Sequence, residues 1–417
     1  MAARAQLRRR VAQDLGVDQP DVLSPGRWRP ARTLLWIRVA IWVGTALTLL
    51  WAPLRGAQIP PFRAYDARTD LLFDTFAHWD AQWFLHIAEH GYDSKQATSF
   101  FPLYPLLVHA VAWVARSAVV AGVLISLVAA AAAAVALVRI ARPLLGPAGA
   151  VDALLLVALY PLAFVFTAPQ SDALFLALVA WSFLLAQRGS PLRAGILGAL
   201  AVATRLIGLA LVPALLVLLW PRRRSLLGLL RPAPILLLPL GLGAYMLYLH
   251  VHVRDAFAFQ HAQQVFWLRR TPTLGPLGGL WESILRGYQG AAEILRHLPR
   301  TGGAPAGYPQ RDHLAAWNSI HLALLLAALA LTWVAWKRFG PAFGLYSVTT
   351  IALVLLSPPK YFPLASFPRY LLGDFPVFLA LAALVQGRPR ARDALLWSFA
   401  AVGGVAAVAY SRGVWVG

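Results

Sequence analysis

Segment 78–92 contains the greatest density of side chains that could do chemistry. It reads His-Trp-Asp-Ala-Gln-Trp-Phe-Leu-His-Ile-Ala-Glu-His-Gly-Tyr. On a helix, Asp80 shares a face with Trp83 and Ile87, and Gly91 is a suitable helix stop. A carboxylate on an aromatic, membrane-facing stripe is costly unless it is paired or used. Asp80 is therefore a candidate functional carboxylate, and the alternative is a solvated or N-capping aspartate on an interfacial helix.

His86, Glu89 and His90 in this segment fit the H-x-x-E-H pattern of inverzincin metalloproteases. Two imidazoles one helical turn apart could bind zinc, with the glutamate as a base. The match is short, however, and no obvious third-ligand motif accompanies it. The chain has no cysteine, which excludes thiolate metal sites, cysteine nucleophiles and disulfides. We predict no zinc centre, leave assistance by a divalent metal open, and interpret Glu89 as a structural or acceptor-side acid.

The composition indicates what kind of protein must position these residues. Of the 417 residues, 59% are hydrophobic and 13% charged, and the mean hydropathy is +0.63. These values exclude a soluble globular protein and predict a polytopic membrane protein. The net charge is +20. In a membrane protein, the distribution of the basic residues among the loops indicates which loops face the cytoplasm. The run Arg222–Arg224 beside an apolar segment is a stop-transfer anchor, and we expect no nucleic-acid partner.

Apolar runs long enough to cross a bilayer recur along the chain. They predict an all-α protein with about eleven transmembrane helices. The runs lie at roughly 33–53, 117–138, 148–167, 171–187, 193–204, 206–220, 228–250, 315–336, 341–357, 369–386 and 394–412. Segment 101–115 is expected to be re-entrant or interfacial, because Pro102 and Pro105 interrupt it. We predict a basic cytoplasmic segment at 1–32 and a single transmembrane domain at 33–417.

The basic residues predict the orientation of the chain. The short turns on the N-terminal side are rich in arginine, which places that side in the cytoplasm. The first helix is expected to remain as a signal anchor, because the residues before it are polar and basic. Two long loops at about 54–116 and 251–314 then lie outside, with shorter turns at 168–172, around 205 and at 358–369. Loops on a rigid scaffold commonly carry function, so we predict an extracytoplasmic active site.

Several of these outer segments resemble a known family. Segment 78–105, with its Trp-Asp, Ile-Ala-x-x-Gly-Tyr and Phe-Pro-Leu-x-Pro elements, is similar to the PIG-V type mannosyltransferases of the GT-C superfamily, which have a large first outer loop. Further elements follow in the family's order: Tyr160-Pro161 to Phe164, Ser171-Asp172-Ala173-Leu174-Phe175, Ala203-Thr204-Arg205 with Gly208, Asp255-Ala256-Phe257 to Gln263 and Trp267, and Ser366-Phe367-Pro368-Arg369-Tyr370 with Phe375-Pro376. This chain departs from the family at Asp172, where the usual acid is glutamate.

The resemblance implies an inverting membrane mannosyltransferase. It would move mannose from dolichyl or polyprenyl phosphate mannose to an acceptor hydroxyl of a glycolipid or glycan. Asp80 matches the family-type base, which takes the acceptor's proton as the anomeric carbon becomes oxocarbenium-like. No soluble cofactor is implied, and the sequence has no Gly-rich phosphate loop. The expected partners are the lipid-linked donor, the acceptor and membrane lipids.

A lipid phosphate leaving group needs cations at the bilayer surface. Arg369 is the first candidate and Arg205 the second, with Lys360 nearby, although each could instead be a snorkelling residue at a helix end. Asp172 could position acceptor hydroxyls or support the site, and an N-cap explains it equally well. Asp374 lies within a predicted span and is a candidate partner of Arg369 at helical spacing.

Aromatic side chains could stack on a sugar or line a prenyl groove, although such residues also form interfacial belts. The candidates for substrate contact, with Glu89, Asp172 and Gln263, are Trp79, Trp83, Tyr92, Trp267 and Tyr370. Two other functions remain open: a secondary transporter or lipid-linked sugar flippase, and a non-catalytic subunit of a glycan-assembly complex. Lysine is scarce among the basic residues and alanine is frequent, which favours a GC-rich bacterial genome and hence a bacterial plasma membrane.

Overall fold

The computed structural model describes residues 29–51, 73, 75–220, 230–297 and 311–416. Most of the predicted cytoplasmic segment 1–32 and the whole Arg222–Arg224 run lie outside the described residues. All regular secondary structure in the described part is helical, which confirms the all-α prediction there. Beyond the helices, the described residues show one isolated β-bridge, between Arg269 and Pro359.

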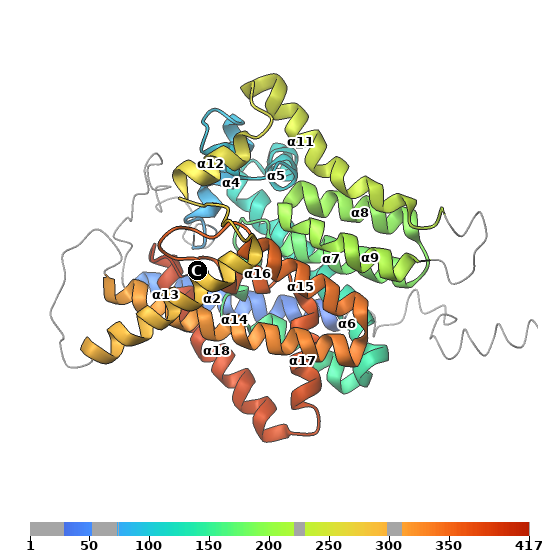
Figure 1. The fold of residues 1–417 in the computed structure, drawn as a ribbon, viewed down its shortest axis with the longest axis vertical. Coiled ribbons are helices and arrows are strands. Elements are labelled where there is room, and N and C mark those ends of the chain that lie inside the picture. The colour runs from blue at the N-terminus through green and yellow to red at the C-terminus, as the bar shows by residue number, and fades with distance from the viewer. Residues whose placement is uncertain (1–28, 52–72, 74, 221–229, 298–310, 417) are drawn as a thin grey trace, which may run out of the picture.

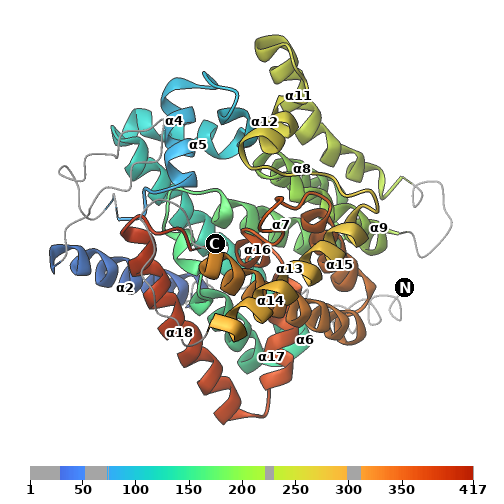
Figure 2. The ribbon, with the colours of Figure 1, turned by 60° about the vertical axis from the view of Figure 1, so that its left-hand side comes forward.

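The α-helices follow the predicted apolar runs closely. They are α2 (Arg29–Trp51), α4 (Asp80–His90), α5 (Leu103–Ala115), α6 (Ala118–Leu159), α7 (Asp172–Gln187), α8 (Pro191–Thr204), α9 (Leu211–Leu219), α11 (Leu238–Val253), α12 (Ala258–Phe266), α13 (Pro276–His297), α14 (Arg311–Phe339), α15 (Pro341–Leu355), α16 (Phe367–Leu371), α17 (Phe375–Val385) and α18 (Pro389–Ser411). Short 3₁₀ helices are η2 (Ala97–Ser99), η3 (Ala163–Phe166), η4 (Leu206–Ala210) and η5 (Ala233–Leu237). Figures 1 and 2 show α4, α5 and α12 together at one end of the helical body, and the turn between α17 and α18 at the other.

Four helical segments in the described residues are long and apolar enough to cross a membrane. They are Ala118–Leu159, Ala233–Val253, Ala316–Phe339 and Pro389–Ser411. Six shorter apolar helices accompany them. These findings fit a membrane protein, while the count of about eleven crossings and the membrane side of each loop stay predictions.

The long helix α6 takes the place of two predicted spans, 117–138 and 148–167. Its halves meet at a kink at Gly146, where φ is +71°, a conformation that glycine adopts at little cost. Pro143 and Pro147 flank the kink and cannot donate backbone hydrogen bonds. The backbone at Gly146 is not helical, so α6 consists of two helical halves, and these halves overlap the two predicted spans.

The second half of α6 ends earlier than the predicted span, because Pro161 forces an extended conformation on the residue before it. From Leu162 to Asp172 the chain runs through η3 and an irregular turn, and every residue is buried. The fully buried Arg38 of α2 donates hydrogen bonds to the carbonyl oxygens of Ala158 and Ala163. A single arginine thus satisfies carbonyl groups where the helix stops, and it fixes the segment that leads to α7.

The segment 251–314 is predicted from the sequence as a long outer loop, with no helix placed in it. It contains α12 and α13, and α13 packs against α14 and α15. A Cβ atom at Gly279 would overlap the carbonyl group of Leu355, so only glycine permits this close approach. The opposite face of α13 exposes apolar side chains such as Trp281 and Tyr288.

The core lies where α6 meets α2, α7 and α17. Small residues of α6 allow close packing, since Ala129, Ala130, Ala133 and Ala134 are all buried. The indole N–H of Trp181 on α7 donates to the carbonyl oxygen of Ala132 on α6 at 2.9 Å. This contact fixes α7, and α7 begins at one of the predicted site residues.

Candidate active site

Four of the predicted site residues form one chain of ion pairs. Arg369 Nη1 lies 2.6 Å from Asp80 Oδ2, and Arg369 Nε lies 3.1 Å from Asp172 Oδ1. Arg205 Nη1 lies 2.6 Å from the same Asp172 oxygen. We call these four residues the ion-pair cluster. Asp80 and Arg369 are separated by 289 positions in the sequence, so the fold as a whole assembles the cluster.

Each member of the ion-pair cluster stands at or near a helix end. Asp80 and Asp172 are the first residues of α4 and α7, where the helix dipole favours a negative charge. Arg205 directly follows the last residue of α8, where the dipole favours a positive charge. Arg369 lies in the short helix α16. The Asp172 carboxylate accepts hydrogen bonds from Arg205 and Arg369, and no hydrogen bond from its side chain to the backbone of α7 is found among the described residues.

Burial differs strongly between the two carboxylates. The Asp172 side chain is 1% exposed, and its Oδ2 atom has no hydrogen-bond partner in the described part of the chain. The Asp80 side chain is 31% exposed. With two arginines and two aspartates the cluster is formally neutral, which lowers the cost of burying it. Asp80 is thus the more accessible carboxylate, whereas the buried Asp172 forms ion pairs with both arginines.

Comparison with known proteins is most specific for the first half of the chain. Residues 32–224 match the family model for mannosyltransferases of the PIG-V type. This match confirms the family resemblance over that range. The matched range contains Asp80, Asp172 and Arg205, whereas Arg369 lies beyond it.

Two individual comparisons accompany the family match. GPI alpha-1,6-mannosyltransferase 2 of Rattus norvegicus is 32% identical over 170 residues, which cover 38% of this chain and 35% of that protein. The similarity thus spans about a third of the length of this curated relative. The chain also superposes on a crystal structure of the Archaeoglobus fulgidus oligosaccharyltransferase in complex with Zn and sulfate. The superposition covers 91% of this chain and 53% of that chain, with a TM-score of 0.40 and 13% sequence identity. That structural likeness is too weak to carry an argument.

A second layer of the site surrounds Tyr370. The Arg205 guanidinium lies over the Tyr370 ring, 5.6 Å from its centroid. Arg269 Nη2 donates to the Tyr370 hydroxyl at 3.5 Å, and Arg269 Nη1 donates to the carbonyl oxygen of Ser357 at 2.7 Å. The sequence reasoning missed Arg269. The signal was present, because Arg269 and Arg270 lie two and three residues after Trp267 in a predicted outer loop.

Three predicted aromatic residues gather around Phe100. The Trp83 ring stacks on the Phe100 ring at 5.7 Å, and Trp267 meets it edge-on at 5.8 Å. The Tyr92 hydroxyl donates to the Phe100 carbonyl oxygen at 2.8 Å. Trp83 is buried, and all these contacts are core packing. This aromatic group supports α4 from the side and is distinct from the ion-pair cluster.

The remaining predicted residues lie at the periphery. Lys360 is exposed, with its ammonium group 5.2 Å from the centre of the Tyr361 ring. Glu89 is exposed near the end of α4. Gln263 is half-buried on α12, and its backbone carbonyl oxygen accepts a hydrogen bond from the backbone N–H of Arg269. Trp79 directly precedes Asp80, and its indole nitrogen is buried with no hydrogen-bond partner among the described residues.

The structure corrects the proposed pairing of Asp374 with Arg369. Asp374 is fully buried and accepts a hydrogen bond from the Ser347 hydroxyl. The helical spacing that suggested the pair does not apply, because α16 ends at Leu371 and α17 begins at Phe375. Arg369 is therefore free to bridge the two carboxylates of the ion-pair cluster.

Among the described residues, the H-x-x-E-H segment at 86–90 included, no group of three or more acidic or histidine side chains is arranged to hold a metal. His86 Nε2 lies 2.9 Å from Asp93, and the His86 and His90 rings stack at 4.7 Å. In the later loop, Asp255 Oδ2 lies 2.7 Å from His261 Nδ1. The hydrogen bond from His261 is the main reason why the pKa of Asp255 is lowered.

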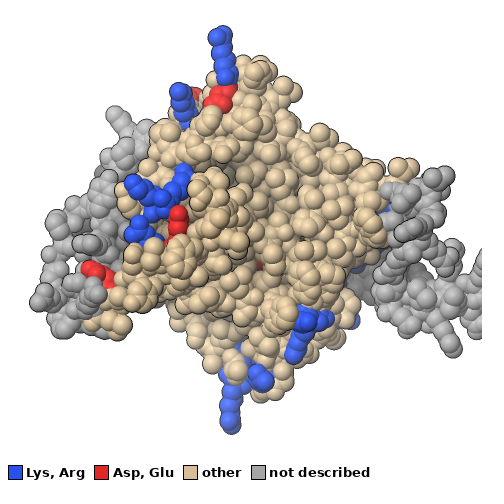
Figure 3. Space-filling model, viewed as in Figure 1, with Lys and Arg blue, Asp and Glu red and all other residues tan. Residues whose placement is uncertain are grey.

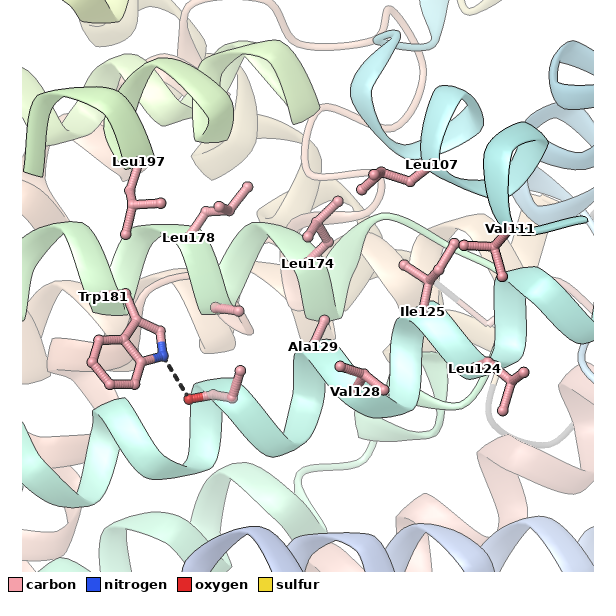
Figure 4. Close-up of a pocket in the computed structure, with 12 residues that line it drawn as sticks. Leu107, Val111, Leu124, Ile125, Val128, Ala129, Leu174, Leu178, Trp181 and Leu197 are labelled. Atoms are coloured by element: carbon pink, nitrogen blue, oxygen red, sulfur yellow. Dashed lines mark hydrogen bonds between the residues drawn. The ribbon is translucent and has the colours of Figure 1, made fainter. Parts of the chain in front are cut away.

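An apolar groove with a volume of about 490 Å³ runs beside the helices that carry the ion-pair cluster. Figure 4 shows its walls, which come from α5, α6, α7 and α8. On α7 the lining begins at Leu174, two residues after Asp172, and ends at Trp181. The indole N–H of Trp181 donates to the carbonyl oxygen of Ala132, so the groove presents an apolar surface without a free hydrogen-bond donor from Trp181. On α8, Leu197 lines the groove, and this helix leads to Arg205.

Proposed function

We propose that the chain is an inverting membrane mannosyltransferase that uses polyprenyl phosphate mannose as donor. Its acceptor is a hydroxyl group of a glycolipid or glycan on the extracytoplasmic side of a bacterial plasma membrane. The observation that carries the proposal is the ion-pair cluster, which couples one accessible carboxylate to two arginines. The family match over residues 32–224 supports the sugar and the reaction class.

Arg369 and Arg205 are suited to the donor phosphate. A guanidinium has five N–H donors, and Arg369 uses Nε and Nη1 for the carboxylates. Its Nη2 remains for a phosphate oxygen. Charge-assisted bonds to phosphate are strong, and they stabilise the negative charge that grows as the C1–O bond breaks. Arg369 and Arg205 therefore bind the leaving group in this proposal.

Asp80 is placed to act as the base. Its Oδ2 holds Arg369, and its Oδ1 makes no hydrogen bond in the described part of the chain. In the transfer step the acceptor oxygen bonds to C1 of mannose, the bond from C1 to the phosphate oxygen breaks, and the acceptor proton passes to Asp80 Oδ1. The lipid phosphate departs with the bonding electron pair.

The apolar groove supports a lipid-linked donor. Along α7 the lining from Leu174 to Trp181 extends over about 10 Å at the rise of an α-helix. It starts beside Asp172, so a prenyl chain lying in the groove would place its phosphate near Arg205. Burial of apolar chain in the groove contributes binding energy in proportion to area, at about 25 cal/mol per Å².

The transporter alternative has less support from the geometry. The buried irregular segment before α7 resembles the broken helices of carriers. The Ala163 carbonyl group in this segment, however, accepts a hydrogen bond from Arg38, as does the Ala158 carbonyl group at the end of α6, so these two groups are not open to an ion. The accessible charge lies at the helix ends, as expected for a surface transferase.

The test is transfer of radiolabelled mannose from polyprenyl phosphate mannose into membrane lipids and proteins. We expect Asp80→Asn to reduce transfer by about 10²- to 10⁴-fold, the usual contribution of a general base. Asp93→Asn is the matched control, because Asp93 is a half-exposed carboxylate in the same loop, and we expect it to retain activity. Equal transfer by Asp80→Asn would reject Asp80 as the base and point to Glu89 or Asp172. No transfer by the wild type would favour the transporter or subunit function.

A further inference from the structure

The end of helix α18 contacts the turn that carries Asp80. The Tyr410 side chain is buried, and its hydroxyl donates to the carbonyl oxygen of His78 at 2.5 Å. The same hydroxyl accepts a hydrogen bond from Gln170 Nε2 at 2.5 Å. Its ring packs against Phe164 with the centroids 4.9 Å apart. Tyr410 therefore joins two segments that are far apart in the sequence and that each lead to a carboxylate of the ion-pair cluster.

The turn before Asp80 has a strained backbone. Trp79 has a φ of +56° and a ψ of −122°, a conformation that side-chain-bearing residues rarely adopt. The carbonyl groups of His78 and Trp79 accept the first backbone hydrogen bonds of α4, from Ala81 and Gln82. Such a turn persists only where its surroundings hold it. The Tyr410 hydroxyl binds one of these two carbonyl groups directly.

The opposite contact of Tyr410 lies next to the second carboxylate. Gln170 is fully buried and stands two residues before Asp172. The carbonyl oxygen of Gln170 accepts from the Ser126 hydroxyl at 3.2 Å, which fixes this segment to α6. The Tyr410 hydroxyl is thus a bridge from a rigid part of the core to the strained turn at Trp79.

We propose that Tyr410 is a positioning residue: its hydroxyl sets the spacing between the turn at His78 and the segment at Gln170, and thereby holds Asp80 against Arg369. The effect of Tyr410 on catalysis rests on the proposed function, whereas its role in holding the turn at His78 does not. Arg369 can bridge both carboxylates only while Asp80 and Asp172 keep their spacing. Tyr410 lies outside the range that matches the family model.

A second contact from the same end of α18 agrees with this assignment. The His78 ring meets the Tyr410 ring edge-on, with the centroids 6.1 Å apart. Burial lowers the pKa of His78, so the ring stays neutral near pH 7. Tyr410 therefore contacts both the backbone and the side chain of His78 in the strained turn.

The test compares Tyr410→Phe with Tyr245→Phe. Tyr245 is an equally buried tyrosine, and its hydroxyl also donates to backbone carbonyl groups, those of Thr98 and Phe100. Amide hydrogen exchange measured by mass spectrometry reports on each turn separately. We expect Tyr410→Phe to speed exchange at Ala81 and Gln82 about tenfold, and Tyr245→Phe to leave these amides unchanged. Unchanged exchange in Tyr410→Phe overturns the proposal.

Mannose transfer by the same variants provides the second measurement. We expect Tyr410→Phe to lower kcat about tenfold with little change in the donor KM, because Asp80 is displaced while the phosphate site remains. Faster exchange with an unchanged kcat would overturn the positioning role. If the wild type transfers no mannose, the proposed function fails, and the exchange measurement still decides whether Tyr410 holds the turn. If Tyr410→Phe does not fold, Gln170→Leu is used in its place in both measurements, because it removes one of the two hydrogen bonds of the Tyr410 hydroxyl.

Discussion

At the residue scale, Arg369 is defined by its shape as well as by its charge. Its Nε and Nη1 atoms reach two different carboxylates, and a lysine ammonium group cannot reproduce that fork. We expect Arg369→Lys to lower kcat/KM for the donor about a hundredfold, or about 2.7 kcal/mol at 1.36 kcal/mol per tenfold change.

Steady-state kinetics with purified protein would measure this loss. Lys360→Arg is the control, because Lys360 is exposed and stands over Tyr361 instead of in the ion-pair cluster. We expect a change of less than about threefold there, in line with the small energies of exposed charges. A lysine at position 369 that supports full activity would show that charge alone is required.

The buried ring of His78 predicts a dependence of stability on pH. Burial lowers the pKa of His78 below the ordinary histidine value of 6.5, so below that pH the unfolded chain binds a proton that the folded chain excludes. Stability must then fall as the pH drops through about 6.5, by up to about 1.4 kcal/mol per pH unit for one proton.

Unfolding in detergent at pH 7.5 and pH 5.5 would measure the effect. We expect His78→Gln to flatten the pH dependence, and His252→Gln, which changes an exposed histidine at the end of α11, to preserve it. An identical pH dependence in His78→Gln and the wild type would contradict the assignment.

At the element scale, the apolar groove between α5, α6, α7 and α8 should distinguish donors by the length of their lipid. Leu178 lines the groove, and a larger side chain there would fill part of it. We expect Leu178→Trp to raise the KM for a long-chain polyprenyl phosphate mannose about tenfold and to leave transfer from a short-chain, water-soluble analogue unchanged.

A matched control is available on α8. Leu192 is exposed and does not line the groove, so Leu192→Trp should transfer mannose from both donors as the wild type does. If Leu178→Trp affected both donors equally, the groove would have no role in binding the lipid chain.

The sequence predicts most helices well, because apolar runs and charged turns alternate along the chain. The run at 171–187 and the observed Asp172–Gln187 differ by one residue. Helix α13 was missed because its apolar residues form a single stripe, which an average over a window conceals. Pro161 lies within the predicted span at 148–167, and it ends α6 at Leu159 although the residues around it are apolar.

The site could be predicted in part for a similar reason. Charge and family resemblance together select Asp80, Asp172, Arg205 and Arg369, yet their pairing depends on how four helix ends converge, which hydropathy does not encode. Tyr410 could not be selected, since a tyrosine near the end of an apolar helix is typical of an interfacial belt. Its main partner is a backbone carbonyl group, and sequence gives no sign of that.

At the scale of the whole molecule, contacts between charged residues follow the predicted sides. The ion-pair cluster joins segments predicted to lie outside. Asp152 and Arg392 come from segments predicted to lie inside, and they meet at 2.6 Å. Figure 3 shows basic side chains around the turn between α17 and α18, at the end of the molecule opposite α4.

The absence of cysteine from the chain allows a direct test of this topology. Lys95, in the first predicted outer loop, and Arg390, at the start of α18, are both exposed. In intact cells we expect a membrane-impermeant maleimide to label Lys95→Cys and not Arg390→Cys, and after lysis to label both. The cysteine-free wild type is the background control, and labelling of Arg390→Cys in intact cells would reverse the orientation.

The contact between Arg38 and the end of α6 has a consequence for biogenesis. The carbonyl groups that Arg38 binds belong to residues 120 and 125 positions later in the chain. When α2 emerges from the ribosome, those residues have not been synthesised. An unpaired arginine at the centre of a membrane helix costs about 2.5–3.5 kcal/mol during insertion. For α2 as a predicted membrane span, we therefore expect a nascent chain stalled before Ala158 to keep α2 at the insertion machinery.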